Sequence, residues 1–154
     1  MKAYADTNFF ISLFCPGPHA VEARRLHSNA IEASQSYPVT ILGRLEFVNA
    51  LQQVVFSTRH GVPGVTSTPE MALTIEAMFF EQVNKGQRFR STTVIETALE
   101  KQFQALSHRH TAKEGFRTYD ILHVSSALVL GCDTFWSFDA KAKKLAKLEG
   151  LEVN

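Results

Sequence analysis

Apolar and polar positions along the chain predict short strands that alternate with amphipathic helices. Short apolar runs bounded by polar or turn residues predict strands at residues 2–6, 37–40, 87–90, 134–138 and 151–153. Apolar residues at steps of three and four predict helices at about 19–35, 41–60, 69–85, 93–106, 119–130 and 140–149. Strands that alternate with helices favour a parallel sheet covered on both faces. We therefore predict an α/β fold.

Local signals mark where some of these helices begin. Thr68 precedes Pro69, which is typical of an N-cap followed by the first helical position. Thr93 and Glu96 have the spacing of a capping box. The segments between these helices, 61–69 and the basic stretch 108–118, are predicted to be loops.

Length and composition fit one globular domain that spans residues 1–154. The chain has 154 residues, 45% of them hydrophobic, and a formal net charge of +1. No apolar run approaches the length of about 18 residues that a membrane helix needs. The N-terminus is a poor signal peptide, and Cys15 and Cys132 lie far apart without a metal-binding spacing. We expect a cytoplasmic protein with two buried thiols and no membrane association.

Four acidic residues fall at positions where a parallel sheet gathers functional groups. Asp6 and Asp139 each end a predicted strand, and Asp120 lies in the first turn of a helix that Thr118 could cap. Glu46 lies one or two turns into a helix that directly follows a strand. Strand carboxyl ends and helix N-termini meet at one edge of such a sheet, so the four side chains can converge there.

Carboxylates gathered at one edge repel each other unless a cation lies between them. Hard divalent ions such as Mg²⁺ and Mn²⁺ prefer oxygen ligands and can activate a water for attack on a phosphodiester. The pattern thus indicates metal-dependent phosphodiester hydrolysis. Each acid alone also fits a helix cap or a solvated surface position, and only the joint pattern favours the site.

The motifs around these acids resemble those of the PIN-domain nucleases, most of all the VapC-type toxins of bacterial and archaeal toxin–antitoxin pairs. Tyr119–Ala127 is the most specific match, since it has an Asp followed by an apolar helix with a His and small residues. The other matching segments are 4–8, 40–50 and 136–139. The resemblance covers nearly the whole chain.

This resemblance implies an α/β/α sandwich around a central, mostly parallel sheet. It also implies an endoribonuclease that uses Mg²⁺ or Mn²⁺, with Asp6, Glu46, Asp120 and Asp139 as catalytic residues and metal ligands. Asn8 and Ser137 would support the acids. A small antitoxin protein and a second copy of the chain would be partners, bound through the helices at 41–60 and 70–84.

Basic residues near these acids are candidates for contact with RNA. The basic stretch that leads into Asp120 contains Arg109, Lys113 and Arg117, and Lys141 lies just after Asp139. The same residues fit a solvated surface equally well or better. His123 is one helical turn after Asp120, and we interpret it as a hydrogen-bonded histidine packed against the sheet rather than a functional group.

Two other functions remain open. A non-catalytic PIN-like module that binds RNA or a protein would use the same acids as helix caps. A phosphatase of the haloacid-dehalogenase type also begins with an Asp at a strand end, but it needs a second Asp where this chain has Asn8.

Overall fold

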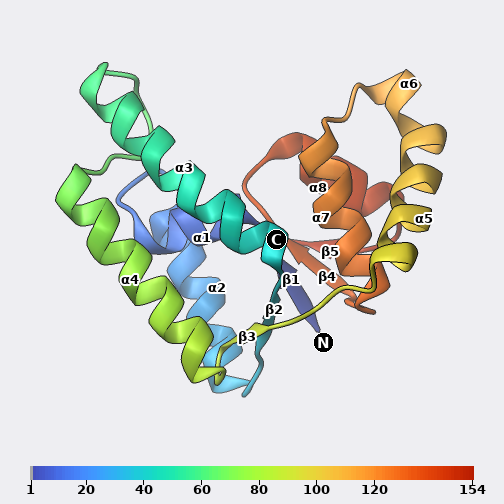
Figure 1. The fold of residues 1–154 in the computed structure, drawn as a ribbon, viewed down its shortest axis with the longest axis horizontal. Coiled ribbons are helices and arrows are strands. Elements are labelled where there is room, and N and C mark those ends of the chain that lie inside the picture. Colours follow the sequence, from blue (N-terminus) through green and yellow to red (C-terminus); the bar gives the residue numbers. More distant parts are fainter. Residues whose placement is uncertain (1) are drawn as a thin grey trace.

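The computed structural model describes residues 2–154, and its paired strands all run parallel (Figure 1). One sheet has the order β1-β4-β5, formed by Ala3–Ala5, Thr134–Trp136 and Glu152–Val153. A second sheet pairs β2 (Tyr37–Val39) with β3 (Phe89–Ser91). β1 and β2 lie close together but belong to separate hydrogen-bonded sheets.

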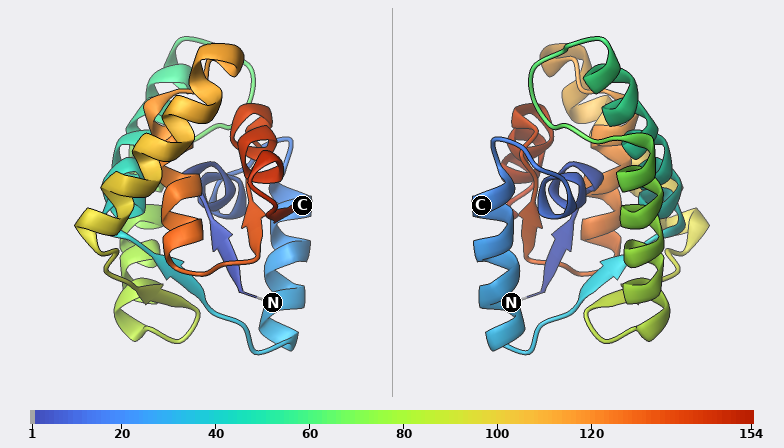
Figure 2. Two further views of the ribbon diagram at one scale, coloured as in Figure 1. Left: turned by 90° about the vertical axis from the view of Figure 1, so that its right-hand side faces the viewer. Right: turned by 90° about the vertical axis from the view of Figure 1, so that its left-hand side faces the viewer.

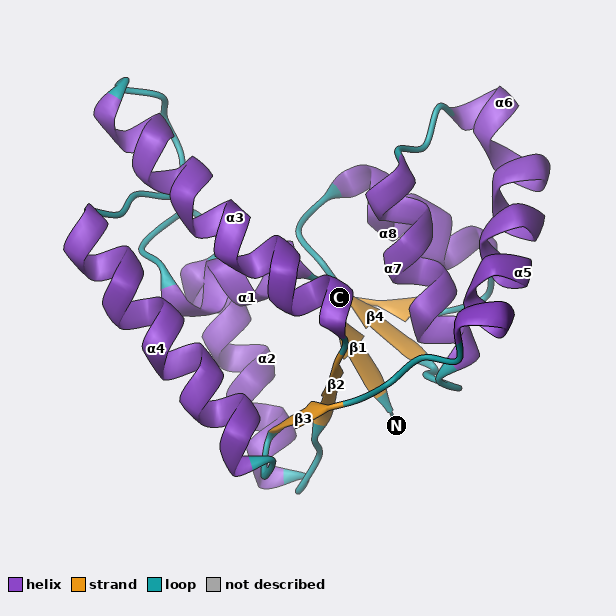
Figure 3. Ribbon diagram, in the orientation of Figure 1, coloured by secondary structure: helices purple, strands orange, loops and turns teal. Residues whose placement is uncertain are grey.

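Helices cover these strands on both sides, which confirms the predicted α/β/α architecture. α1, α2, α3 and α4 lie on one side of the strands, and α5, α7 and α8 lie on the other (Figures 1 and 3). α3 and α4 pack along each other (Figure 2). The helices are α1 (Thr7–Phe14), α2 (Ala20–Glu32), α3 (Ile41–Arg59), α4 (Pro69–Lys85), α5 (Glu96–Leu106), α6 (Ala112–Glu114), α7 (Thr118–Val129) and α8 (Ala140–Leu148). None of those in residues 2–154 combines the length and apolar character that a membrane crossing requires.

Two apolar clusters form the core, one on each side of β1. Phe9, Phe10 and Phe79 belong to the first cluster, which joins β2 and β3 to α1, α3 and α4. Tyr4 and Phe135 belong to the second, which joins β1 and β4 to α7 and α8. Both thiols are buried, as expected, and burial raises the pKa of each to about 11.

Several predicted boundaries are confirmed by their capping contacts. The Thr68 hydroxyl accepts a hydrogen bond from the Met71 N–H at 3.2 Å at the start of α4. The same helix ends at Gly86, whose φ of 64° is a left-handed conformation that favours glycine.

Other predictions about local structure are wrong. The structure adds α1 directly after Asp6, where the sequence pattern predicted no helix because its face is apolar almost all round. The capping box at Thr93 and Glu96 does not form, since α5 starts at Glu96 itself. Thr118 does not cap α7, because Arg117 occupies the N-cap position.

The predicted loop at 108–118 is largely helical. α5 continues through a π-helical turn at Ser107–Thr111 into the short α6, and only 115–117 lie outside helices. Glu149 at the end of α8 stabilises this extension, because it accepts hydrogen bonds from Arg109 and His110, each at 2.6 Å. Local sequence gave no sign of this long-range contact.

Candidate active site

Asp6 and Asp139 follow paired strands and each begins a helix. The Asp6 carboxylate accepts a hydrogen bond from the Phe9 N–H at 2.8 Å and caps α1. Asp139 caps α8 by accepting from the N–H groups of Lys141 (2.8 Å) and Ala142 (3.2 Å). Because β1 pairs with β4 in parallel, their carboxyl ends deliver both acids to the same edge of the sheet.

Asp120 and Glu46 reach this edge from two further elements. Asp120 lies in the first turn of α7, and Glu46 lies in the second turn of α3. Together with Asp6 and Asp139 they line one pocket of about 460 Å³. The structure thus brings all four predicted acids to a single cavity from four separate parts of the chain.

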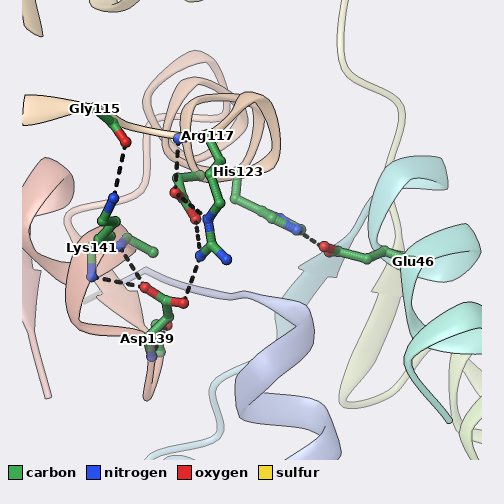
Figure 4. A network of polar contacts seen from close by, with 9 residues as sticks. Glu46, Gly115, Arg117, His123, Asp139 and Lys141 are labelled. Carbon is green, nitrogen blue, oxygen red and sulfur yellow. Dashed lines mark hydrogen bonds and ion pairs between the residues drawn. The ribbon is translucent and has the colours of Figure 1, made fainter. Parts of the chain in front are cut away.

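Arg117 lies between two of the acids. Its Nε and Nη2 atoms donate to the two Asp120 carboxylate oxygens at 3.1 and 3.0 Å, and Nη2 also donates to Asp139 Oδ2 at 2.7 Å (Figure 4). The Arg117 backbone N–H adds a further bond to Asp120 Oδ2 at 3.0 Å. The positive charge of one guanidinium therefore reduces the repulsion between the two carboxylates.

This contact alters the ionisation of its members. Burial opposes ionisation of Asp139, but the Ala142 N–H and the Arg117 guanidinium outweigh it, so the pKa of Asp139 is lowered. Hydrogen bonds to Asp120 and Asp139 raise the pKa of Arg117. Both residues are held in their charged forms.

Glu46 is held by a different set of side chains. Its Oε2 atom bonds both to His123 Nε2 and to the Thr7 hydroxyl (Figure 4 shows His123). Tyr4, on β1, bonds to the other ring nitrogen of His123 at 2.9 Å. Donation by Tyr4 to Nδ1 leaves Nε2–H to donate to Glu46. Burial opposes ionisation of Glu46, but His123 and Thr7 outweigh it and lower its pKa.

Asp6 lies deepest of the four acids, and its side chain is the least stabilised as an anion. Burial raises the pKa of Asp6 to about 6, although His123, the Ser137 hydroxyl and the Phe9 N–H favour the charged form. A carboxylate that is costly to ionise in a polar pocket is a common property of functional sites.

Of the two expected support residues, Ser137 is hydrogen-bonded to the acids, whereas no hydrogen bond joins Asn8 to them among residues 2–154. The Ser137 hydroxyl bonds to Asp6 and accepts from the Asp139 N–H at 2.9 Å, so it links the two strand-end acids. Asn8 lines the pocket from an exposed position on α1.

The four candidate RNA contacts are placed differently from one another. Arg117 alone among them lines the pocket, and it is paired with Asp120 and Asp139. Lys141 Nζ donates to the Gly115 carbonyl at 3.1 Å (Figure 4). Arg109 is paired with Glu149, and Lys113 is exposed on α6.

The donor atoms of the pocket suit a hard divalent ion. All four acids offer carboxylate oxygens, and Mg²⁺ typically binds through one or two carboxylates with water in its other positions. Within residues 2–154, no three His, Cys, Asp or Glu side chains converge closely enough to hold an ion alone. Asp120 and Asp139 nevertheless share one cationic nitrogen, which shows that they can share a cation.

Thr7 and His123 both contact Glu46, although the sequence pattern indicated no role for Thr7 and only a packing role for His123. Thr7 directly follows Asp6, but its bond to Glu46 joins residues that are 39 positions apart. His123 is packed against the sheet and hydrogen-bonded, as expected, yet it also holds Glu46 across 77 positions. Its helical spacing from Asp120 was the only signal that could have placed it at the site.

The protein is of the α/β class, with four carboxylates in one pocket at the edge of a parallel sheet. A model of the PIN domain family matches residues 3–148, and the chain belongs to this family. PIN domains are typically nucleases and generally use divalent metal ions. A comparison with curated protein sequences finds no match.

Solved structures of similar fold are VapC toxins and related complexes. VapC20 of Mycobacterium tuberculosis, a toxin that cleaves the sarcin–ricin loop, is 18% identical with a TM-score of 0.63, over 93% of this chain and 94% of that one. VapBC2 of Rickettsia felis, solved with a DNA fragment of its promoter, is 12% identical with a TM-score of 0.67, over 100% and 98%. FitAcB of Neisseria gonorrhoeae is 11% identical with a TM-score of 0.60, over 98% and 95%.

Proposed function

We propose that this protein is a cytoplasmic, metal-dependent endoribonuclease and the toxin of a toxin–antitoxin pair. The observation that carries the proposal is the convergence of Asp6, Glu46, Asp120 and Asp139 in one pocket. Membership of the PIN family supports hydrolysis of phosphodiesters, and the similarity to VapC toxins supports RNA as the substrate.

The four acids would hold Mg²⁺ or Mn²⁺ through their carboxylate oxygens. When bound, the ion lowers the pKa of a coordinated water and neutralises charge on the phosphodiester. Tyr4 and His123 hold the Glu46 carboxylate in position, and Ser137 fixes Asp6 relative to Asp139. These supports restrict the acids to one geometry.

The test is cleavage of RNA with Mg²⁺ or Mn²⁺ by wild type, Asp120→Asn and Glu100→Gln. Glu100 is an exposed acid on α5 outside the pocket, and its variant is the control. We expect Asp120→Asn to lose more than about 100-fold in rate, beyond the loss typical of residues that only support ligands. Equal cleavage by wild type and Asp120→Asn would contradict the mechanism.

One observation favours a second function, a non-catalytic PIN-like module that binds RNA or a protein. Arg117 is already paired with Asp120 and Asp139, so these two acids have a cationic partner without a metal ion. Calorimetry with Mn²⁺ separates the two functions. Binding that Asp6→Asn removes would reject the module, and its absence together with inactivity on RNA would support it.

A toxin of this kind requires a protein partner and a surface to bind it. The neighbours from Rickettsia felis and Neisseria gonorrhoeae carry the names VapBC2 and FitAcB. On this chain, exposed apolar side chains lie on α3 and α4, and they support binding of both a small antitoxin and a second copy of the chain: Ile41, Leu45, Phe56, Leu73 and Met78.

The toxin role is tested by inducible expression in bacteria. Expression of wild type should arrest growth, whereas expression of Asp6→Asn should not.

A further inference from the structure

A second groove lies beside the acid pocket on the outer face of α8. It has a volume of about 410 Å³ and is lined by Phe138, Ala140, Lys143, Lys144 and Lys147. These α8 residues share one side of the helix, while Ala142, Leu145 and Ala146 are buried on the other. The groove therefore combines an aromatic ring with three ammonium groups.

The groove begins next to Asp139 in the chain. Asp139 lines the acid pocket, whereas the residues on either side of it, Phe138 and Ala140, line the groove. From Ala140 to Lys147 the groove follows α8 for about 10 Å, given a rise of 1.5 Å per residue. The groove thus begins at the two neighbours of Asp139 and continues along α8, on the side of the helix opposite to Ala142, which lines the acid pocket.

Two of the three lysines carry uncompensated charge. Lys144 is paired with Glu114 at 2.5 Å, so its charge is largely neutralised. No ion pair joins Lys143 or Lys147 to a carboxylate in the part of the chain that the structure describes. The net charge of the whole chain is only +1, so these lysines form a local positive surface beside an acidic pocket.

Phe138, the aromatic residue that lines the groove, belongs to a stack of rings that extends beyond the groove lining. The exposed His19 ring lies parallel to Phe138, with centroids 4.5 Å apart and planes at 5°. Phe138 in turn stacks on the buried Phe9, with centroids 6.2 Å apart. Phe138 thus links the buried Phe9 to the exposed His19, which packs on Phe138 next to the groove.

We propose that this groove binds single-stranded RNA beside the acid pocket, with Lys143 and Lys147 on its phosphates and the His19–Phe138 stack against a base. Surfaces for single strands typically combine a positive track with aromatic platforms. The four acids outnumber Arg117, the one guanidinium that lines the pocket, so a neighbouring positive track adds attraction for phosphate. This inference rests on the proposed function, since it names how the substrate would lie.

The test measures binding without cleavage, using a labelled 12-nucleotide single-stranded RNA in EDTA at several salt concentrations. We expect Lys143→Ala/Lys147→Ala to weaken binding at least tenfold. The slope of log affinity against log salt should fall by about 1.4, because each phosphate contact contributes about 0.7. His19→Ala should weaken binding about fivefold with the slope unchanged, as loss of stacking predicts.

The control is Lys85→Ala/Lys101→Ala, which removes the same number of charges from exposed lysines of α4 and α5 outside the groove, although Lys85 is paired with Glu81. An equal loss in this control, or unchanged binding in Lys143→Ala/Lys147→Ala, would overturn the inference. Tighter binding of duplex DNA than of single-stranded RNA would also overturn it.

Cleavage by the same proteins with Mn²⁺ separates this inference from the proposed function. If wild type cleaves RNA but loss of Lys143 and Lys147 changes neither binding nor cleavage, RNA binding in the groove is rejected and the proposed endoribonuclease function is kept. If RNA binding depends on the groove lysines but wild type does not cleave RNA, RNA binding in the groove is supported and the proposed endoribonuclease function is rejected.

Discussion

Arg117 gives the pocket a cation of its own. Its guanidinium contacts both Asp120 and Asp139, although 63% of its side chain is exposed. A divalent ion that binds these carboxylates has to compete with this contact. At the scale of single residues, Arg117 therefore controls how available the two acids are to a metal.

We expect Arg117→Ala to bind Mn²⁺ about tenfold more tightly than wild type, a gain of about 1.4 kcal/mol. The reason is that two carboxylates lose their guanidinium partner while keeping their positions at the N-termini of α7 and α8. Isothermal titration calorimetry measures this affinity directly. Arg109→Ala is the control, since Arg109 is paired with Glu149 outside the pocket, and equal affinity of both variants would contradict the role of Arg117.

Asp6 and Asp139 should affect stability in opposite directions as pH changes in metal-free buffer. The pKa of folded Asp6 is raised to about 6 by burial, so its contribution to stability is lost as pH rises from about 4 to 6. Asp6→Asn should therefore exceed wild type in unfolding free energy at pH 7 by up to about 3 kcal/mol, and match it near pH 4.

Asp139 provides the matched comparison. Its pKa is lowered in the folded protein, where the Ala142 N–H and Arg117 outweigh burial, so its stabilising contribution is present at neutral pH and is lost in acid. Asp139→Asn should be less stable than wild type at pH 7. Urea denaturation across this pH range measures both variants, and parallel pH profiles for all three proteins would contradict the assigned ionisation.

At the scale of elements, the sequence predicts best where local chemistry decides. α4 begins at Thr68-Pro69 and ends at Gly86 as the caps indicate. The sequence pattern predicts helices poorly where distant contacts decide. An example is α5, which extends through a π-helical turn because Arg109 and His110 in that turn are bonded to Glu149. A basic segment without apolar periodicity has no local signal for that helix.

Gly86 and Gly43 show how local backbone conformation should determine the effect of an alanine substitution on stability. Gly86 has a left-handed φ of 64°, so Gly86→Ala should lower the unfolding free energy by about 1 kcal/mol. Gly43 lies in the first turn of α3, where an added Cβ would meet only Thr40 Oγ1 at 3.7 Å. Gly43→Ala should raise the unfolding free energy by about 0.5–1 kcal/mol. Urea denaturation measures both, and shifts of the same sign would contradict this account.

At the scale of the whole molecule, α3 and α4 leave apolar side chains in solvent on the side of the molecule away from α5 and α8 (Figure 1). Phe56 on α3 is 62% exposed and contacts the ring of His60. Side chains of this size at a surface favour association with another protein.

We expect Phe56→Glu to weaken self-association, because it places a charge in the apolar surface that the proposed homodimer would bury. Sedimentation velocity over a range of concentrations measures the change. Leu148→Glu makes the same kind of change on α8, where Leu148 is 48% exposed, and should leave self-association unaltered. Equal behaviour of the two variants would place the interface elsewhere.

The sequence alone determined the strands, most of the helices and the four acids. These follow from local causes: apolar periodicity, capping residues, and the rule that parallel strands present their carboxyl ends at one edge. The rule was sufficient to bring Asp6, Glu46, Asp120 and Asp139 to one pocket. Their roles in metal binding and catalysis remain predictions.

Only the tertiary structure decided how those acids are held. Glu46 meets His123 across 77 positions, and Arg117 meets Asp139 across 22. Such contacts depend on the directions in which packed helices present their side chains, and the sequence pattern does not encode these directions locally. The same holds for the rings next to the groove, because His19 and Phe138 stack although they lie in distant parts of the sequence.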